Sequence, residues 1–372
     1  MTRTILCIDI GTSSLKAALL SKNPKEQEVF VSRQAFPQEA FEYSSSAFFY
    51  ISSLRAALEE LCQKNPDYVI EAVCVSGNGP TVISDDYTTL LYSDLFVSPS
   101  RGRASVRIKE ILKNTKSLFI PRFVAFKELF KDSWNQSAFI FGAPEFLIYK
   151  LTGKAFAILP EERFLPAYWT DEELVRSLFP PYDRKKIPPF IKSASLAGFV
   201  SPRIAAETGL PENIPVYTGA PDFVVALIGS GTVVPGRLCD RAGSSEGLNL
   251  CTSKPVFSEG LRTLPSVVPG LWNLSYLLDA KAPSYEEEFA HGINLLRETA
   301  LANSIPFPQT MTISGGQAFN ENLIKQKEKI SGLQIKKMPL EDAELLGDLI
   351  LARLAAGEFE NIQQAVSSVL GD

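Results

Sequence analysis

The feature that most constrains this chain is an eight-residue segment near its start, Asp9-Ile10-Gly11-Thr12-Ser13-Ser14-Leu15-Lys16. It joins two β-rich runs, Thr4–Ile10 and Leu15–Leu20, so the spacing predicts a hairpin with a Gly-Thr-Ser-Ser turn. Small turn residues let successive N–H groups converge on one anion, and the hydroxyls add donors. An ordinary Gly/Ser-rich hairpin would explain the turn alone, but the whole octet after an apolar strand favours phosphate binding.

The composition fits a two-domain protein that does not bind nucleic acid. The chain has 372 residues, 45% of them hydrophobic, and a formal net charge of −5. A domain usually takes about 100–200 residues, so two domains are expected. The basic residues are scattered apart from short runs such as Arg184-Lys185-Lys186, which we predict to be solvated surface. The sequence therefore has no basic footprint for nucleic acid or for an anionic membrane.

The histidine and cysteine content narrows the chemistry further. His291 is the only histidine, which excludes sites built on several histidines, and we expect it to be a helix-surface or packing histidine. The five cysteines are far apart without CxxC spacing, which fits a reducing compartment. Only Met1–Arg3 precede the first apolar run, and no uncharged apolar stretch reaches about 18 residues, so a cytoplasmic protein is expected. Any metal should be Mg²⁺ held by carboxylates.

Strands alternate with helices along the chain, which is typical of an α/β fold. We expect a helix over Ser46–Lys64, a buried strand over Glu71–Ser76, an amphipathic helix over Phe139–Leu151 and a strand over Pro215–Ala220. The stretch Leu159–Pro189 is rich in proline and charge, and we interpret it as a surface excursion.

A glycine-rich break, Gly229-Ser230-Gly231, is the predicted domain junction. It gives a first domain over residues 1–232 and a second over residues 233–372. The second half opens at Arg237–Cys251 with a strand, a Gly243-Ser244-Ser245 turn and a strand. Each half is therefore expected to begin with a hairpin.

A single acidic residue, Asp222, follows the strand at Pro215–Ala220 and begins a helix-like segment. An aspartate in this position is most often a helix cap. A carboxylate held there can also act as a general base that accepts the proton of an attacking hydroxyl. The position by itself favours the cap.

Two further glycine turns are candidates for nucleotide contacts. The turn at Gly243–Ser245 could hold distal phosphates, although a plain hairpin turn has the same composition. In Ile313–Ala318 the doubled glycine allows the close approach of a flat ring, and the helix that begins near Asn320 can direct its N-terminus at phosphate or ribose oxygens. Each of these turns is a weak signal alone.

In order and spacing these segments resemble the FGGY family of carbohydrate kinases, which share the fold of actin, Hsp70 and hexokinase. The resemblance covers nearly the whole chain. Besides the octet it is carried by Val75–Pro80 (VSGNGP), Leu91–Asp94 (LYSD), Phe141–Gly153, Ala197–Gly231 and a last helix at Glu341–Gly357, in which Gly347 allows close packing.

The resemblance implies a role for individual residues. Asp222 is implied to be the catalytic base, which reverses the preference for a cap, and Asp9 is implied to hold the metal. The residues implied to bind the nucleotide are Asp9, Gly11, Thr12, Ser13, Ser14, Lys16, Gly243, Ser244, Ser245, Gly315, Gly316, Gln317 and Asn320. Those implied to contact the sugar are Asn78, Gly79, Asp94 and Asp222.

The chain departs from the family pattern at several positions. It is shorter, and the loss falls between Trp272 and Gly315, where the family's Gly-Glu-Arg-x-Pro signature is absent. Phe223 replaces the asparagine expected after the base, and Gln317 replaces the third glycine of the adenosine loop. In the sugar site, Asn78-Gly79-Pro80 replaces Gln-Met-His-type side chains. The phosphate-binding residues are mostly retained, while the sugar and adenine contacts differ.

We therefore expect two actin-like, ribonuclease H-like domains, each a mixed sheet flanked by helices, with the active site in the cleft between them. The expected reaction is transfer of the ATP γ-phosphoryl group, with Mg²⁺, to a hydroxyl of a small sugar or polyol, and a homodimer is possible. A second hypothesis is an inactive pseudokinase that binds a sugar or nucleotide as a sensor or scaffold. A reductive activator of the same superfamily ranks last, because no cysteine cluster could hold an iron–sulfur centre.

Overall fold

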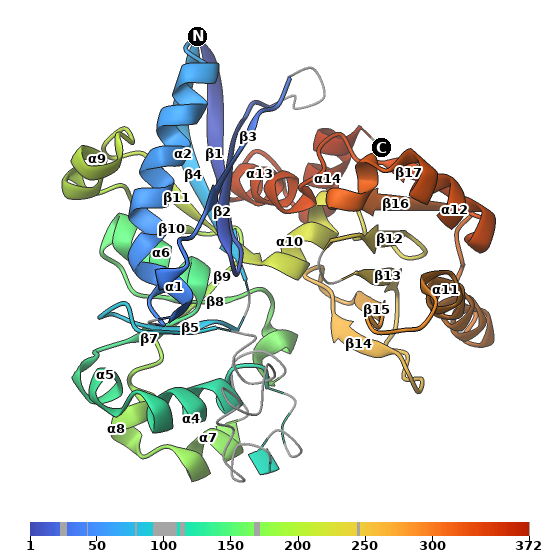
Figure 1. The fold of residues 1–372 in the computed structure, drawn as a ribbon, viewed down its shortest axis with the longest axis horizontal. Coiled ribbons are helices and arrows are strands. Elements are labelled where there is room, and N and C mark those ends of the chain that lie inside the picture. Colours follow the sequence, from blue (N-terminus) through green and yellow to red (C-terminus); the bar gives the residue numbers. More distant parts are fainter. Residues whose placement is uncertain are drawn as a thin grey trace. The chain divides into compact units, whose positions relative to one another are not determined.

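The computed structural model describes residues 1–22, 28–42, 44–78, 80–91, 110–111, 115, 117–166, 172–243 and 246–371. The chain divides into two compact units, and the division falls between Asp222 and Phe223. This is ten residues before the predicted boundary at 232. Each unit contains a mixed sheet with helices beside it (Figure 1), which confirms the expected α/β architecture.

The first unit is built on a six-stranded sheet with the order β10-β11-β4-β1-β2-β3. Strands β11, β4 and β1 are parallel neighbours, and the other pairs in this sheet are antiparallel. The bounds are Thr2–Ile10 for β1, Ser14–Leu20 for β2, Val31–Ala35 for β3, Tyr68–Gly77 for β4, Leu196–Phe199 for β10 and Pro215–Pro221 for β11. The hairpin predicted from the octet is thus β1–β2.

Strand β1 is buried on both faces, as parallel strands at the centre of a sheet usually are. Its alternate residues Leu6, Ile8 and Ile10 join one hydrophobic core with buried leucines of α2 (Tyr50–Lys64) and apolar residues of α6 (Ala143–Thr152). Full burial of one such aliphatic side chain contributes about 1.5–3 kcal/mol. This core holds the central strands, and therefore their carboxyl ends, in fixed register.

Two predicted helices begin later than expected. The Ser46–Lys64 helix starts with a 3₁₀ turn, Ser46–Phe49, before α2. The helix predicted at Phe139–Leu151 is wrong at its start, because Ile140–Phe141 form strand β7, which pairs with β5 (Val82–Ser84). Gly142 then has extended dihedral angles, and α6 starts at Ala143.

The interpretation of Leu159–Pro189 as a surface excursion is wrong in part. The described residues of this stretch form α7 (Glu172–Leu178) and α8 (Pro181–Arg184), and Phe164 and Phe179 are buried. Phe179 stacks on Trp134 with ring centroids 5.9 Å apart. In this stretch Pro181 begins helix α8, and several charged residues form ion pairs, so the stretch is not a solvated loop.

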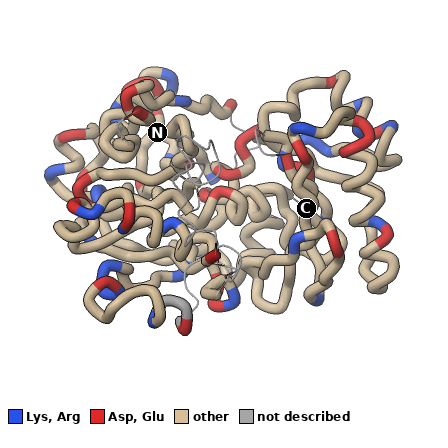
Figure 2. The backbone as a smooth tube through the Cα atoms, turned by 60° about the horizontal axis from the view of Figure 1, so that its bottom comes forward, with Lys and Arg blue, Asp and Glu red and all other residues tan. Residues whose placement is uncertain are grey.

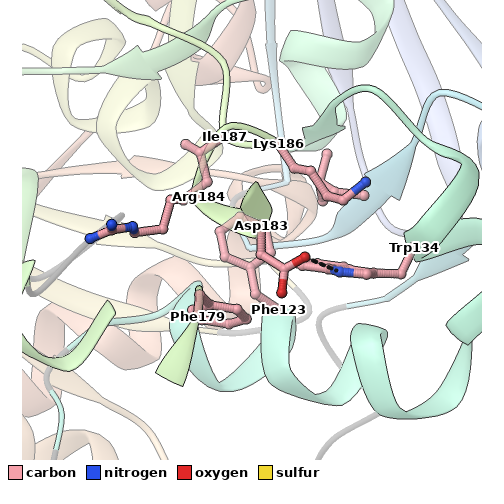
Figure 3. Close-up of a pocket in the computed structure, with 8 residues that line it drawn as sticks. Phe123, Trp134, Phe179, Asp183, Arg184, Lys186 and Ile187 are labelled. Carbon is pink, nitrogen blue, oxygen red and sulfur yellow. Dashed lines mark hydrogen bonds between the residues drawn. The ribbon is translucent and has the colours of Figure 1, made fainter. Parts of the chain in front are cut away.

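The prediction that Lys186 is solvated is also wrong, because its side chain is buried and its Nζ donates to the Ser137 carbonyl at 2.5 Å. Beside it, Asp183 accepts from Trp134 Nε1 at 2.9 Å and pairs with Lys127 at 2.5 Å. Figure 3 shows Trp134, Asp183 and Lys186 among the residues that line a small pocket, whose volume of about 240 Å³ includes open solvent. Its enclosed part holds one water molecule at most, so we assign it no ligand.

The first unit contains further described elements. They are α1 (Glu39–Glu42), β6 (Thr89–Leu90), α4 (Ile120–Leu129), α5 (Lys131–Gln136), β8 (Ala157–Leu159), the 3₁₀ turn Glu162–Phe164, β9 (Phe190–Lys192) and α9 (Pro202–Thr208).

The second unit repeats the central plan of the first. Its sheet has the order β14-β15-β13-β12-β16-β17, with an antiparallel hairpin β12–β13 and a strand, β16, parallel to β12. The bounds are Leu238–Arg241 for β12, Gly247–Thr252 for β13, Arg262–Pro265 for β14, Trp272–Leu277 for β15, Thr310–Ser314 for β16 and Gln334–Lys337 for β17. In both units, therefore, a hairpin strand pairs in parallel with a later strand.

The helices of the second unit include one that was not predicted. They are α10 (Asp222–Gly229), α11 (Tyr285–Ala302), the 3₁₀ turn Gly316–Phe319, α12 (Glu321–Ser331), α13 (Ala343–Ala355) and α14 (Ile362–Leu370). The helix predicted as the last, Glu341–Gly357, is α13, and α14 follows it. His291 is exposed on α11 with its ring edge on Tyr276, as a helix-surface histidine was expected to be.

The backbones of helices α10 and α13 pack directly against each other at two glycines. A Cβ at Gly347 would lie 2.1 Å from the Val225 carbonyl oxygen, and a Cβ at Gly229 would lie 1.8 Å from that of Ala343. The prediction that Gly347 permits close packing is confirmed.

Charges of both signs are interspersed along the chain (Figure 2), in agreement with the absence of a basic stripe. Among the described residues, no helix combines the length and apolarity that crossing a membrane requires.

Glu145, in the first turn of α6, gives the first unit a pH dependence that we can predict. Its carboxylate is buried, accepts the Ile158 N–H at 3.0 Å, and has a pKa that burial raises to about 7 from 4.5. Ionisation therefore costs more in the folded than in the unfolded state, so stability falls as pH rises from about 4.5 to about 7, by up to about 3 kcal/mol. In urea denaturation, Glu145→Gln should lose less of its free energy of unfolding over this pH range, because an amide does not ionise. Glutamine can still accept the hydrogen bond from Ile158 N–H.

The control is Glu59→Gln, an exposed glutamate on α2. It should leave the pH slope of the free energy of unfolding as it is in the unmutated chain. An unchanged slope in Glu145→Gln would contradict the assignment.

Candidate functional site

Three of the predicted site residues follow the ends of three neighbouring parallel strands. The pairing sets Ile10 of β1 opposite Gly77 of β4, and Gly77 opposite Pro221 of β11. The next residues along the chain, Gly11, Asn78 and Asp222, therefore leave the same edge of the sheet. Since neighbouring strands are about 4.8 Å apart, Gly11 and Asp222 are separated by about 10 Å across this edge. Such edges are where α/β folds bind ligands.

Asp9 and Lys16 face each other across the β1–β2 hairpin. They are register partners, and Lys16 Nζ lies 3.5 Å from Asp9 Oδ2. The Asp9 side chain is 4% exposed and that of Lys16 is 26% exposed. The hairpin thus holds one carboxylate and one ammonium group at the strand end, with the ammonium group closer to solvent.

The turn of the hairpin is held by hydrogen bonds on both sides. Gly11 N donates to Ser14 O at 2.9 Å, which closes a two-residue loop of Thr12 and Ser13. Ser13 O accepts from Phe36 N, also at 2.9 Å. The N–H of Gly11 is therefore used inside the turn, and Ser14 already belongs to β2. Of the predicted phosphate-binding residues, Thr12 and Ser13 form the tip.

Asn78 connects β4 to this tip. Its backbone N–H donates to Ile10 O at 2.6 Å, and its side-chain Nδ2 donates to Thr12 Oγ1 at 3.1 Å. Thr81 in turn donates to Asn78 Oδ1 at 3.1 Å. The close approach requires the glycine that precedes it, because a Cβ at Gly77 would lie 2.9 Å from Ile10 O. The side chain of Asn78, which was predicted as a sugar contact, is in this structure hydrogen-bonded to the tip of the hairpin turn.

Asp222 is the first residue of α10, so it lies in the first turn of a helix. Negative charge is favourable there, which is the ordinary structural role of such an aspartate. Its side chain is only partly buried. The pairing of β11 with β4 is irregular between Thr218 and Pro221, immediately before it. Irregular strand ends re-aim side chains and are frequent beside active sites.

Four predicted site residues, Gly79, Asp94, Ser244 and Ser245, lie outside the described residues. Their roles stay predictions.

The glycine turns of the second unit also follow neighbouring parallel strands. Arg241 of β12 pairs with Ser314 of β16, so Gly243 and Gly315 each come shortly after a strand end. Ala242 N donates to Ser314 O at 2.8 Å, and Gln317 N donates to Ala242 O at 3.2 Å. Gly315 has φ +89°, and a Cβ there would lie 2.6 Å from Ala242 O. Only glycine fits at this contact.

The side chains of Gln317 and Asn320 make contacts within the chain. Gln317 Nε2 donates to Glu246 Oε2 at 3.0 Å, and its Oε1 accepts from Lys327 Nζ at 3.2 Å. Asn320 Oδ1 accepts from Leu323 N at 3.1 Å and caps α12. By contrast, Gly316 is exposed. In the loop predicted to contact adenosine, both carboxamides are therefore hydrogen-bonded within the chain. The backbone and the exposed Gly316 are the parts of this loop that a ligand could approach.

The sequence did not reveal a buried charge cluster beside this loop, made by Asp240, Glu246 and Lys327. Lys327 Nζ lies 2.5 Å from Asp240 Oδ2 and 2.9 Å from Glu246 Oε1. Tyr285 OH donates to Glu246 Oε1 at 2.7 Å. One signal was present: Lys327 shares a helical face with the buried Ile324 and so is a lysine among apolar positions.

Burial affects the acid–base properties of this cluster. It raises the pKa of Asp240, and the nearby Lys327 ammonium group opposes that rise. Burial also raises the pKa of the Tyr285 hydroxyl well above its usual range, as does the hydrogen bond to Glu246. Tyr285 therefore stays a neutral hydrogen-bond donor to Glu246.

Comparison with known proteins finds carbohydrate kinases among both the curated sequences and the solved structures. No family model matches the chain. A xylulose kinase of Lactococcus lactis is 25% identical over 259 residues, which are 62% of this chain and 49% of that protein, so the match spans about half of that relative. A xylulose kinase of Bacillus subtilis is 20% identical over 455 residues of alignment, covering 98% of this chain and 91% of that protein. The crystal structure of Plasmodium falciparum glycerol kinase with ADP superposes with a TM-score of 0.72 at 15% identity, covering 98% and 92% of the two chains.

The two-unit fold is that of the carbohydrate kinases, which confirms the actin-like fold class. The curated relatives are carbohydrate kinases as well, so the comparisons support the resemblance to the FGGY family.

The contact between Gly315 and Ala242 predicts a large effect of one methyl group. Gly315→Ala should lower the free energy of unfolding by about 3 kcal/mol or more, because it adds a backbone clash to the cost of a positive φ. Gly332→Ala is the matched control, since Gly332 also has a positive φ, +68°, but no atom within 4 Å of a Cβ. It should cost about 1 kcal/mol. Equal losses for the two variants in urea denaturation would contradict the close contact.

Proposed function

We propose that this protein transfers the γ-phosphoryl group of ATP to a hydroxyl of a small sugar or polyol. The observation that carries the proposal is the common sheet edge of the first unit. The phosphate-binding hairpin leaves it after β1, and Asp222 leaves it after β11, about 10 Å away. A phosphate group at the turn and an acceptor hydroxyl at Asp222 fit within that span.

In the proposed reaction Asp222 orients the acceptor hydroxyl and accepts its proton. The hydroxyl oxygen forms a bond to the γ-phosphorus, the bond from that phosphorus to the β–γ bridging oxygen breaks, and ADP leaves. Phosphoryl transfer needs little covalent chemistry from the protein, so positioning and charge stabilisation dominate the rate. Asp222 suits the task because it is partly exposed at a helix start, where its ionised form is stabilised.

The hairpin supplies the charge stabilisation. Lys16 is the ammonium group next to the turn, and the tip residues Thr12 and Ser13 offer hydroxyls to phosphate oxygens. Asp9 is the carboxylate available for Mg²⁺, which commonly takes one or two carboxylates and completes its shell with phosphate oxygens and water. Bound there, the ion would neutralise phosphate charge. The donor set of one buried carboxylate beside an anion-binding turn fits this ion.

For the second unit we propose the nucleotide-binding role. The turn after β12, with Gly243, would contact phosphates, and Gly315-Gly316 would pass beside the adenosine. The glycerol kinase of similar fold that was crystallised with ADP supports a nucleotide as the phosphoryl donor. Gln317 and Asn320 are assigned to supporting this loop rather than to touching the nucleotide, since their side chains are hydrogen-bonded within the chain.

The acceptor we propose to test first is a pentulose, because both curated relatives are xylulose kinases. Hexuloses and polyols follow, since the side chains of the sugar-site turn differ from the family pattern. A coupled ADP-release screen over these compounds with MgATP tests the proposal directly. Turnover above the rate of ATP hydrolysis without acceptor is the expected result.

The pseudokinase alternative is favoured by one observation: the adenosine loop has a glutamine in place of its third glycine, and that side chain is fixed in the protein. Calorimetry separates the two functions. MgATP or sugar binding without turnover on any compound of the screen would support the pseudokinase and contradict the kinase.

Replacing the proposed base should separate chemistry from nucleotide binding. Asp222→Asn keeps the shape of the side chain but cannot accept the proton, so kcat should fall about 100-fold to 10,000-fold with the calorimetric Kd for MgATP nearly unchanged. Glu212→Gln, an exposed residue shortly before β11, is the control and should retain full activity. Equal kcat for Asp222→Asn and the unmutated chain would remove Asp222 from this role.

A further inference from the structure

The buried charge cluster of Asp240, Glu246 and Lys327 lies at the base of the turn assigned to the nucleotide phosphates. We infer that Lys327 is a positioning residue for the nucleotide, which holds Asp240 of β12, Glu246 before β13 and the double-glycine loop in one arrangement. The inference rests on the proposed function, because it assumes that these two loops bind ATP.

Lys327 joins the two strands of the hairpin where they meet the turn. Asp240 belongs to β12, and Glu246 directly precedes β13, so the two carboxylates bracket residues 241–245. A single Nζ contacts both, at 2.5 Å and 2.9 Å. The two ends of the turn cannot separate without breaking one of these ion pairs.

The same ammonium group also reaches the double-glycine loop through Gln317. The side-chain carboxamide of Gln317 bridges Lys327 and Glu246. The backbone N–H of Gln317 donates to Ala242 O. Gln317 thus contacts the turn at Ala242 on one side and at Glu246 on the other. The phosphate turn and the adenosine loop therefore share one hydrogen-bonded network whose centre is Lys327.

Burial makes this network rigid. The side chains of Lys327 and Asp240 are both 0% exposed, and that of Glu246 is 8% exposed. Charges without water are costly unless each has partners in good geometry, and a well-packed apolar group would often be as stable. Such a cluster has few alternative arrangements at low energy, since breaking a pair leaves a buried charge unpaired. Two rings of α11, Tyr285 and Phe289, lie within 6 Å of the Lys327 Nζ and close its other side.

The consequence should be confined to nucleotide binding. Without the Lys327 ammonium group, two carboxylates remain beside a turn that accepts anionic phosphates, and the link from Lys327 to Gln317 Oε1 is lost, so fewer contacts join the turn to the double-glycine loop. Phosphate affinity should fall on both counts. The sugar contacts and Asp222 belong to the first unit, so sugar affinity should be retained.

The test is calorimetry of the full chain with MgATP, and separately with the sugar that the screen identifies. Lys327→Met, which keeps an unbranched side chain one atom shorter than lysine, should raise the Kd for MgATP at least tenfold and change the Kd for the sugar less than twofold. Lys329→Met is the matched control, because Lys329 is an exposed lysine two residues further along α12. It should bind both ligands as the unmutated chain does.

A second variant serves if Lys327→Met does not fold. Glu246→Gln keeps the Lys327–Asp240 ion pair. With its amide oxygen on Lys327 Nζ, the new glutamine directs its NH₂ group at Gln317 Nε2, so that two donors face each other. Rotating the Gln317 carboxamide by half a turn would instead place the Gln317 NH₂ group against Lys327 Nζ. The loop is then disconnected while the ammonium group remains, so a Kd for MgATP raised about threefold or more is expected.

The outcomes are distinct. Unchanged MgATP affinity in a folded Lys327→Met or in Glu246→Gln overturns the inference, as does an equal loss of MgATP and sugar affinity, which would indicate general loss of structure. These measurements need no turnover, so a chain that binds MgATP but phosphorylates nothing would contradict the proposed function and leave the inference standing. Failure of the unmutated chain to bind MgATP would overturn both.

Discussion

The parallel pairing of β1 with β4 and of β4 with β11 is the constraint on which the rest of the first unit depends. It places Ile10, Gly77 and Pro221 level with one another, so that the hairpin turn, Asn78 and Asp222 leave the sheet at one edge. Because side chains alternate along a strand, a shift of one residue in the pairing of β1 with β4 would turn Asp9 from one face of the sheet to the other. The apolar core beneath α2 and α6 holds this register, so the site depends on packing that lies some distance from it.

Much of this unit was predictable from local sequence. The octet predicts both the β1–β2 hairpin and the neighbourhood of Asp9 and Lys16, because turn residues and strand-forming residues act over a few positions. The order of the strands, and hence the proximity of Asp222 to the hairpin, came from the family resemblance. Composition and periodicity did not supply it, since Asp222 is more than 200 residues from the octet. Its role stays a prediction, whereas the fold that surrounds it is confirmed.

What the sequence did not predict are the buried charges. Lys186 stands in a run of three basic residues and was predicted to be solvated, yet its partner is the carbonyl of Ser137, 49 residues away. Lys327 reaches Asp240 from 87 residues away. A lysine can be buried where the fold places a hydrogen-bond acceptor within reach of its Nζ. The position of that acceptor is a property of the folded chain. Only the apolar face on which Lys327 lies could have drawn attention to it.

The two units support their turns in related ways, and the difference between them explains where the charge cluster is needed. In each, a strand parallel to the hairpin ends in a glycine that touches a hairpin carbonyl, and a carboxamide shortly after it reaches the turn: Asn78 in the first unit and Gln317 in the second. Asn78 meets a neutral threonine hydroxyl, whereas Gln317 meets the carboxylate of Glu246. A buried carboxylate needs a countercharge that a carboxamide cannot supply. Lys327 supplies it and also donates to Gln317 Oε1, so the glutamine in place of the family's third glycine and the buried lysine belong to one arrangement.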